Sequence, residues 1–243
     1  GSTNIAGSYA VGEAAGTHGA TRPGGSALNA GQVFGTRVAE HVGAIGAPVW
    51  AGDVTQAAAD AVRALDTVLA AESPLTVKSV RADVQARMSD RAGILCTGSE
   101  VATALADART VNAKIKQNGI AVSRPSEAAR TVQWQQMALA SEAVLCALDT
   151  YISNGGGSRG ARAICDHKGD ALPDTVQGPI AAARFRAERD ADKDQQLIVT
   201  YDGAQMHVSS RDNRRHDGAH SFFERDWPAW LTGDIFQSGG KSA

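Results

Sequence analysis

Apolar residues recur every three to four positions along most of the first 155 residues, which is the spacing of amphipathic helices. The stretch Ile5–Val11 differs, because it is a short apolar run that ends at a glycine, and it predicts a buried strand. A glycine-rich loop is expected over Glu13–Gly25, and a helix follows from Ser26 to about Val42. Helical spacing returns over about Val54–Ala71, where we predict a second helix.

Local start and stop signals predict the helices that follow. Ser73 is a suitable N-cap and Pro74 a suitable first-turn residue for a helix that ends near Met88. The segment Thr97–Glu100 has the pattern of a capping box, in which the side chains at the two ends satisfy each other's backbone N–H groups. The helix that this segment starts is expected to stop at Gly119.

The last long helix opens at Pro125 and is expected over about Ser126–Ile152, before the glycines at 155–157. Residues 53–153 therefore predict about four helices. Helices of sufficient length with an apolar stripe bury that stripe by packing against one another, and short connections make neighbours antiparallel. We thus expect a helical bundle in the middle of the chain.

The pattern of the last third of the chain is different. A short extended piece is expected over Arg159–Cys165, and the highly charged run Ala183–Lys193 predicts a solvated face or loop. Two strand-like runs, Leu197–Tyr201 and Ala204–Ser209, flank an Asp-Gly pair and predict a β-hairpin. Aromatic residues in the stretch FFERDWPAWLTGDIF should hold the tail against the body of the protein.

Composition and charge exclude several classes of function. The chain is 43% hydrophobic, which suffices for a core, and its formal charge of -2 gives no basic surface for nucleic acid. It contains no run of eighteen apolar residues for a membrane span and no signal-peptide pattern. Cys96, Cys146 and Cys165 are odd in number and widely spaced, so we expect buried, reduced thiols in a cytoplasmic protein.

Histidine and cysteine spacing gives no metal site. His216 and His220 are four residues apart, but Gly218 lies between them and the segment predicts a loop, not a helix that would align them. The sequence has no CxxC or HExxH motif and no cysteine pattern for an iron–sulfur cluster. We therefore predict no metal in this chain.

The segment GEAAGTHGATRPGGSALNAGQVFG, which begins at Gly12, carries the main chemical signal. Gly24 and Gly25 let the backbone approach a ligand, and the following helix offers unpaired N–H groups at the positive end of its dipole. Glu13 is placed to accept hydrogen bonds from ligand hydroxyls, and the guanidinium of Arg22 suits a carboxylate. The alternative is a plain connector in which Glu13 and Arg22 pair with each other or with solvent.

This segment also resembles the C-terminal flavin-binding segment of the succinate dehydrogenase/fumarate reductase flavoprotein family. That family has a Gly-Glu pair after a strand, then a His-Gly-Ala-Asn-Arg-Leu-Gly loop, then a helix under the flavin. The counterparts here are Gly12 with Glu13, the loop His18–Gly24, and the helix from Ser26. A second match is Gly157–Ala161, which resembles the Ser-Arg-Gly segment after the family's helical bundle.

The resemblance implies a fold and a division of the chain. The fold would be α/β plus α: the C-terminal portion of a Rossmann-like FAD-binding domain, then a helical bundle, then a small β tail. Residues 1–52 would be the segment of the FAD-binding domain, residues 53–155 the bundle, and residues 156–243 the tail with the β-hairpin. Arg159 would either form an ion pair within the bundle or face the rim of the active site.

The resemblance further implies which residues contact FAD. Gly12 and Glu13 would hold the ribityl or ribose region. Ala27 and Leu28 would present backbone N–H groups to the N1/O2 edge of the flavin, which fits the helix-dipole argument because reduced flavin is negatively charged there. Ser26 and Asn29 are candidates by position only.

Two residues of the loop are the catalytic candidates that the resemblance implies. Arg22 would bind a carboxylate or another oxyanion of the substrate above the flavin. His18 matches the family's loop histidine, and we favour a role in bracing the loop over a role in catalysis. The family's Asn-Arg-Leu is Thr21-Arg22-Pro23 here, and Pro23 fixes φ and removes a backbone donor. For that reason we do not carry succinate or fumarate over as the substrate.

The other half of the family's flavin site has no counterpart in this sequence. No strand is followed by GxGxxG, and Gly155–Gly157 follows a helix, so it is a stop signal. We therefore expect the C-terminal chain of a split or processed FAD-dependent oxidoreductase, which transfers a hydride between flavin and a small anionic substrate. A partner chain would carry the N-terminal FAD-binding half and the capping domain. The alternative is a non-catalytic structural subunit that completes the flavoprotein fold.

Overall fold

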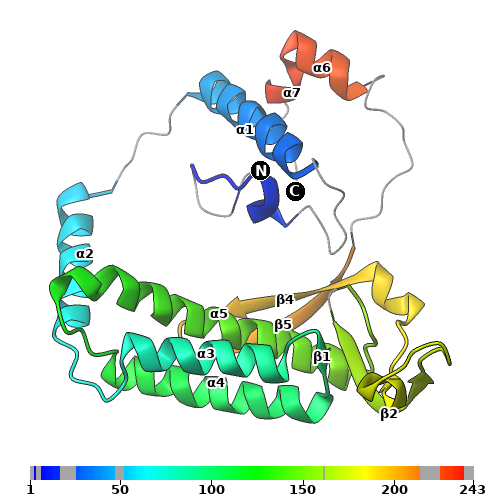
Figure 1. The fold of residues 1–243 in the computed structure, drawn as a ribbon. Coiled ribbons are helices and arrows are strands. Elements are labelled where there is room, and N and C mark those ends of the chain that lie inside the picture. The colour runs from blue at the N-terminus through cyan, green and yellow to red at the C-terminus, as the bar shows by residue number, and fades with distance from the viewer. Residues whose placement is uncertain are drawn as a thin grey trace. The chain divides into compact units, whose positions relative to one another are not determined.

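The computed structural model describes residues 3, 7–16, 26–46, 52–160, 162–213 and 225–237. They fall into two compact units, each treated by itself: residues 1–52 with 214–243, and residues 53–213. The larger unit combines helices with two small sheets, so the fold is mixed helical and sheet (Figure 1). Residues 17–25, with His18 and Arg22, lie outside the described residues, as do His216 and His220.

Three long helices form the body of the larger unit: α3 (Val77–Arg91), α4 (Gly98–Asn118) and α5 (Ala128–Ser153). They lie side by side in Figure 1. The Asn112 amide donates to Glu142 Oε2 over 2.7 Å, and Arg109 approaches the Cys146 sulfur at 3.7 Å. The residue numbers of the contacting positions rise along α4 while they fall along α5. The two helices are therefore antiparallel, as the sequence predicts.

Capping explains where two of these helices begin. The Thr97–Glu100 capping box is confirmed: Thr97 Oγ1 accepts from the Glu100 N–H at 3.2 Å, and Glu100 accepts from the Thr97 N–H at 3.1 Å. The expected start at Ser73 is wrong. Thr76 and Ser79 form a second reciprocal box, and α3 begins at Val77, because two backbone donors are satisfied there at once.

The core lies mainly between α4 and α5. Val101, Ala104 and Ala108 on α4 are fully buried, together with Leu145 on α5, and Ile164 from the sheet completes the cluster. The alanines bring the two helix backbones close together, which explains how a chain poor in aromatic residues still packs tightly. A second cluster around Val80, Val84, Ile120 and Ala138 fastens α3 to α5.

Helix α2 (Val54–Leu69) differs from the others in burial. Asp53 caps it by accepting from the N–H groups of Thr55 and Gln56. It contacts α5, yet none of its residues is buried, although its apolar positions keep helical spacing. Exposed large apolar side chains on it include Val62 and Leu65. The sequence predicted helix α2 correctly, but it did not predict that the apolar side chains of this helix remain exposed.

Two small sheets complete the larger unit. Strands β1 (Leu95–Cys96), β2 (Ala163–Ala171) and β3 (Arg184–Phe185) form one sheet, in which β1 and β2 are parallel. Strands β4 (Gln195–Tyr201) and β5 (Met206–Asp212) form the predicted hairpin. The turn is fixed by the Asp202 carboxylate, which accepts from the N–H groups of Ala204 and Gln205. Val199, Met206 and Val208 cover the core beside α5.

The charged run at 183–193 is largely exposed, as the predicted solvated face or loop requires, but it also contains regular elements and makes specific contacts. It contains β3 and the 3-10 turn η4 (Asp190–Asp194), and two of its arginines bind the end of α5. Arg186 donates to the carbonyl oxygens of Ile152 (2.8 Å) and Gly156 (3.1 Å), and Arg189 donates to that of Asn154 at 2.7 Å. Carbonyls at a helix C-terminus are unpaired and negatively polarised, so they attract cations.

The smaller unit is built around α1 (Ser26–Ile45), close to the predicted helix. The 3-10 turn η1 (Gly12–Ala15) packs on α1, and α7 (Asp234–Gln237), which follows α6 (Trp227–Thr232), also contacts it. Of the strand expected over Ile5–Val11, only residues 7–11 are described, and they form no regular strand. The described part of this unit contains no strand for them to pair with.

Candidate functional site

The predicted site residues divide by whether the structure describes them. His18 and Arg22 lie outside the described residues. Gly12 is buried, and Glu13 is exposed in η1, with its backbone carbonyl accepting from the Gly16 N–H at 2.9 Å. Residues 27–29 form part of the first turns of α1.

Gly12 packs against Gly31 of α1. Its φ of 64° is in the left-handed region, which favours glycine, and a Cβ built on it would lie 3.5 Å from the Gly31 Cα. The chain therefore turns sharply at Gly12 and places Glu13 beside the helix. This brings the Gly-Glu pair and the start of α1 into one small region, as a ligand-binding segment requires.

The described side chains at the start of α1 are half-buried or exposed. Leu28 is 79% exposed, Ala27 is half-buried and Asn29 is exposed. The first turn contains no acidic residue, so no carboxylate there opposes an anionic or electron-rich group. The N–H groups of a first turn have no partner within the helix, and the helix dipole makes this end positive. An electron-rich edge of a flat ligand fits such a helix start.

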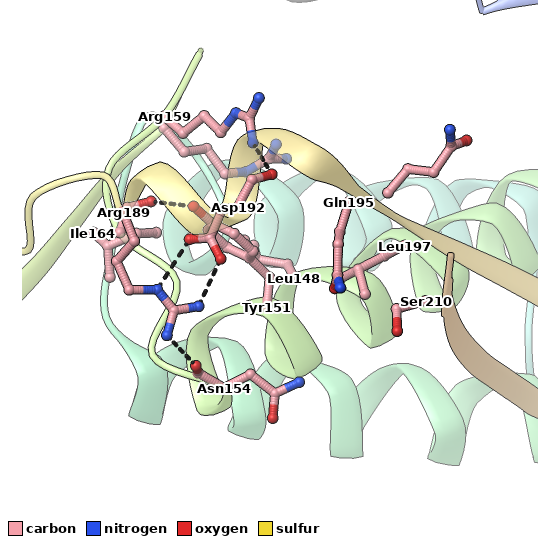
Figure 2. A pocket seen from close by; sticks show the side chains of 13 residues that line it. Leu148, Tyr151, Asn154, Arg159, Ile164, Arg189, Asp192, Gln195, Leu197 and Ser210 are labelled. Atoms are coloured by element: carbon pink, nitrogen blue, oxygen red, sulfur yellow. Dashed lines mark hydrogen bonds and ion pairs between the residues drawn. The ribbon is translucent and has the colours of Figure 1, made fainter. Parts of the chain in front are cut away.

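A pocket in the larger unit is a second candidate site that sequence reasoning missed. It lies where the end of α5 meets η4 and the β4–β5 hairpin, and its cavity is about 360 Å³. We call it the arginine pocket, because Arg159, Arg162 and Arg189 line it. Figure 2 labels Arg159 and Arg189. Its other polar lining includes Tyr151, Asn154, Asp192, Gln195, Gln196 and Ser210.

Asp192 joins two of the arginines on one side of the pocket. Arg189 binds its carboxylate through two nitrogens, Nη2 to Oδ1 at 2.7 Å and Nε to Oδ2 at 3.1 Å. Arg159 donates to the Asp192 backbone carbonyl at 2.8 Å and pairs with Glu188 at 3.1 Å. The hydrogen bond from Arg189 holds the pKa of Asp192 below its usual range. Arg159 therefore forms its ion pair within this unit.

The glycines before β2 make room for this arrangement. A Cβ on Gly157 would lie 1.7 Å from the Ala187 carbonyl oxygen, so no side chain fits there. The Tyr151 hydroxyl donates to the Gly157 carbonyl at 2.9 Å, and burial raises the pKa of this tyrosine. The glycine run is thus more than a helix stop: it admits the backbone of the 183–193 segment against the end of α5.

Thiols and metal ligands add no further site in the described part of the chain. Cys96 and Cys146 are buried, and this burial raises the pKa of both thiols. All three cysteines are free. Among the described residues, no group of three or more His, Cys, Asp or Glu side chains is placed to hold a metal ion. No described helix is both long enough and apolar enough to cross a membrane.

Comparison with solved structures places the fold. It is similar to a variant of FrdA of the quinol fumarate reductase from E. coli, with a TM-score of 0.65 and 17% sequence identity. The similarity covers 86% of this chain and 34% of that chain, so the protein spans about a third of the length of this neighbour. No family model and no curated protein matches the sequence. At this identity the likeness is one of fold.

Proposed function

We propose that this chain supplies the C-terminal part of an FAD-dependent oxidoreductase of the succinate dehydrogenase/fumarate reductase type. The agreement between the fold and a local sequence motif supports the proposal. The fold is similar to FrdA over 86% of the chain, and the ordered motif from Gly12 to Asn29 resembles the flavin-binding segment of that family. Backbone fold and local sequence thus point to the same family.

The residues at the start of α1 fit FAD. Glu13 would accept hydrogen bonds from the ribityl or ribose hydroxyls, since it is exposed directly after the buried Gly12. The backbone N–H groups of Ala27 and Leu28 would face the N1/O2 edge of the flavin, and the absence of acid in this turn supports that role. Ser26 and Asn29 are secondary candidates by position. When bound, FAD would supply hydride transfer to or from a substrate carbon.

Arg22 is proposed as the substrate anchor. A guanidinium binds a carboxylate through two parallel hydrogen bonds, which fixes both the position and the orientation of the substrate. The substrate is accordingly a small anion, whose reacting carbon would be held above the flavin by this contact. His18, four residues earlier in the same loop, would brace the loop.

A partner chain is proposed to supply the dinucleotide-binding half and the capping domain, since residues 1–243 match only the C-terminal part of the family's flavin site. Exposed apolar side chains on each unit, taken by itself, support covered surfaces: Val33 and Phe34 on α1 of the smaller unit, and Val62 and Leu65 on α2 of the larger unit. Apolar stripes of this kind mark surfaces that another protein covers.

Substitution of Arg22 in the assembled flavoprotein tests the proposal. Turnover of a panel of small carboxylates would be followed with a reduced viologen dye as electron donor, and flavin content by absorbance. We expect Arg22→Ala to lower kcat/KM about 100-fold or more while flavin is retained. Arg37→Ala, on α1, is the matched control and should leave turnover unchanged. If Arg22→Ala leaves turnover unchanged, the chain has the structural role that is the alternative.

A further inference from the structure

We propose that the arginine pocket binds a small organic anion, with the Arg162 guanidinium holding the charged head and Leu148, Ile164 and Leu197 surrounding the apolar body. Nothing in the flavin proposal requires this pocket, because all its lining residues belong to the larger unit and the flavin motif belongs to the smaller one. The inference therefore stands or fails separately from the flavin proposal.

The charge of the pocket favours an anion. Three arginines and a single carboxylate line it, whereas the whole chain has a formal charge of -2. Both oxygens of that carboxylate, on Asp192, are already bound by Arg189. Arg159 is in turn paired with Glu188, so the positive charge left without an ion pair among the lining residues is that of Arg162, and the lining has no unbound carboxylate to attract a cation.

Arg162 is the arginine with hydrogen-bonding capacity left. Arg159 and Arg189 are held by Glu188, Asp192 and the end of α5. Among the described residues, the side chain of Arg162 donates through Nε alone, to the Ala92 carbonyl at 3.2 Å. Its two terminal nitrogens make no hydrogen bond to any residue that the structure describes. The Nε contact fixes the plane of the guanidinium and leaves its fork for a carboxylate or phosphate.

The floor of the pocket favours a ligand with an apolar body over a bare inorganic ion. Ile164 and Leu148 are buried beneath it, and Leu197 is half-buried on β4. Figure 2 shows Leu197, flanked by Gln195 and Ser210, on the side of the pocket opposite the Arg189–Asp192 pair. A cavity of about 360 Å³ has the size of small-molecule sites, which combine an apolar lining with a few placed polar groups.

An NMR titration of the purified protein at low ionic strength tests this site. Phenyl phosphate and benzoate are the organic probes, and inorganic phosphate is the comparison. Saturable shifts of the backbone amides at Arg162, Leu197 and Ser210 are expected with the organic probes. Inorganic phosphate should bind more weakly, because it has nothing to place on the apolar floor.

Three variants distinguish binding of the probe in the pocket from non-specific attraction of an anion to a charged surface. Arg162→Gln should weaken binding of phenyl phosphate about tenfold, the size expected for one charge-assisted contact. Ser210→Tyr fills the cavity from an exposed strand position and leaves Arg162 in place, so it should weaken binding even if Arg162→Gln disturbs the fold. Arg130→Gln is the matched control, on α5 about 30 Å from Tyr151 along the helix, and should bind as the wild type does.

Several results would overturn the proposal. These are the absence of saturable shifts up to about 10 mM probe, equal weakening by Arg130→Gln, and equal affinity for inorganic phosphate. Displacement of both probes by a short poly-glutamate peptide that binds more tightly than either would also overturn it. That last result would identify the pocket as a contact for an acidic protein segment.

Discussion

The Trp230 indole donates to Glu40 Oε2 over 3.1 Å and so joins α6 to α1 across 190 positions of sequence. Trp230 also stacks on Trp227, with ring centroids 5.1 Å apart. These contacts realise the expectation that aromatic residues hold the tail against the protein. We predict that Trp230→Phe, which keeps an aromatic ring but is smaller and lacks the N–H donor, lowers the stability of the smaller unit by at least about 1 kcal/mol.

Limited proteolysis of the 225–237 segment measures that change, since α6 must detach before cleavage. Trp230→Phe should raise the cleavage rate at least about fivefold. Leu231→Ala, on the same helix and well exposed, serves as the control and should leave the rate near that of the wild type. Equal acceleration by both variants would mean that the Glu40 contact does not hold the segment.

Gly157→Ala is predicted to destabilise the larger unit by about 3 kcal/mol. The added Cβ would meet the Ala187 carbonyl oxygen at 1.7 Å, and backbone on both sides would have to move. Gly178→Ala is the control: Gly178 has a positive φ of 88° but open space, so only backbone strain of about 1 kcal/mol is expected. Urea unfolding should rank the two variants in that order, and the reverse order would contradict the close contact.

Thr97→Ala is predicted to lower the free energy of unfolding by about 1 kcal/mol, because one N–H of the first turn of α4 loses its acceptor. Thr103→Ala, an exposed position inside the same helix, is the control, and its effect should be within about 0.5 kcal/mol of zero. Thermal unfolding of the two variants measures the difference. Similar losses for both would show that the effect comes from the threonine methyl groups, not from the cap.

Asp192 should make the free energy of unfolding of the larger unit depend on pH. Its pKa is lowered by the hydrogen bond from Arg189, so its contribution is complete above the ordinary aspartate pKa of about 3.9 and is lost as pH falls through the lower folded value. We predict that Asp192→Asn costs about 1 kcal/mol at pH 7 and much less once the pH falls below the lowered pKa of Asp192. Asp90→Asn, at an exposed position, controls for the change in net charge.

Melting temperatures of the wild type and both variants across this pH range provide the measurement. Converging curves for wild type and Asp192→Asn at low pH are the expected result. A constant difference at all pH values would show that Asp192 acts through its shape and not through its charge.

Local signals predicted the elements whose causes are local. The Thr97–Glu100 box, the stop at Gly119 and the Asp202-Gly203 turn each depend on residues within a few positions, and all three are confirmed. Ser73 is not the N-cap of α3. Thr76, three residues later, is the N-cap, because Thr76 and Ser79 each accept a hydrogen bond from the other's backbone N–H. Competition between neighbouring caps is decided by geometry that a single-residue preference does not contain.

The arginine pocket could not be predicted because its causes are distant in sequence. Arg186 and Arg189 lie in a run that resembles an exposed loop, and their partners are carbonyls at the end of a helix more than 30 residues earlier. Every residue has a backbone carbonyl, so the sequence does not indicate which carbonyl will accept a hydrogen bond from a distant arginine. The glycines at 155–157 were the available signal, since three in a row indicate close approach as well as a helix end.

The resemblance to a flavin-binding segment could be recognised from sequence because the residues that carry it are contiguous. The structure adds the Gly12–Gly31 contact, the exposure of Glu13 and the exposure of Leu28 at the start of α1. It also adds a fold similar to FrdA. Arg22 and His18 stay predictions, because they lie outside the described residues.

The central claim is that this chain belongs to a flavoprotein, and its most direct test is an absorbance spectrum with intact mass on material purified under native conditions. The account predicts an oxidised-flavin spectrum together with a second polypeptide that contains a dinucleotide-binding sequence. A single folded species of 25.2 kDa without flavin, which also fails to bind added FAD, would contradict it. The motif at 12–29 would then serve the fold alone.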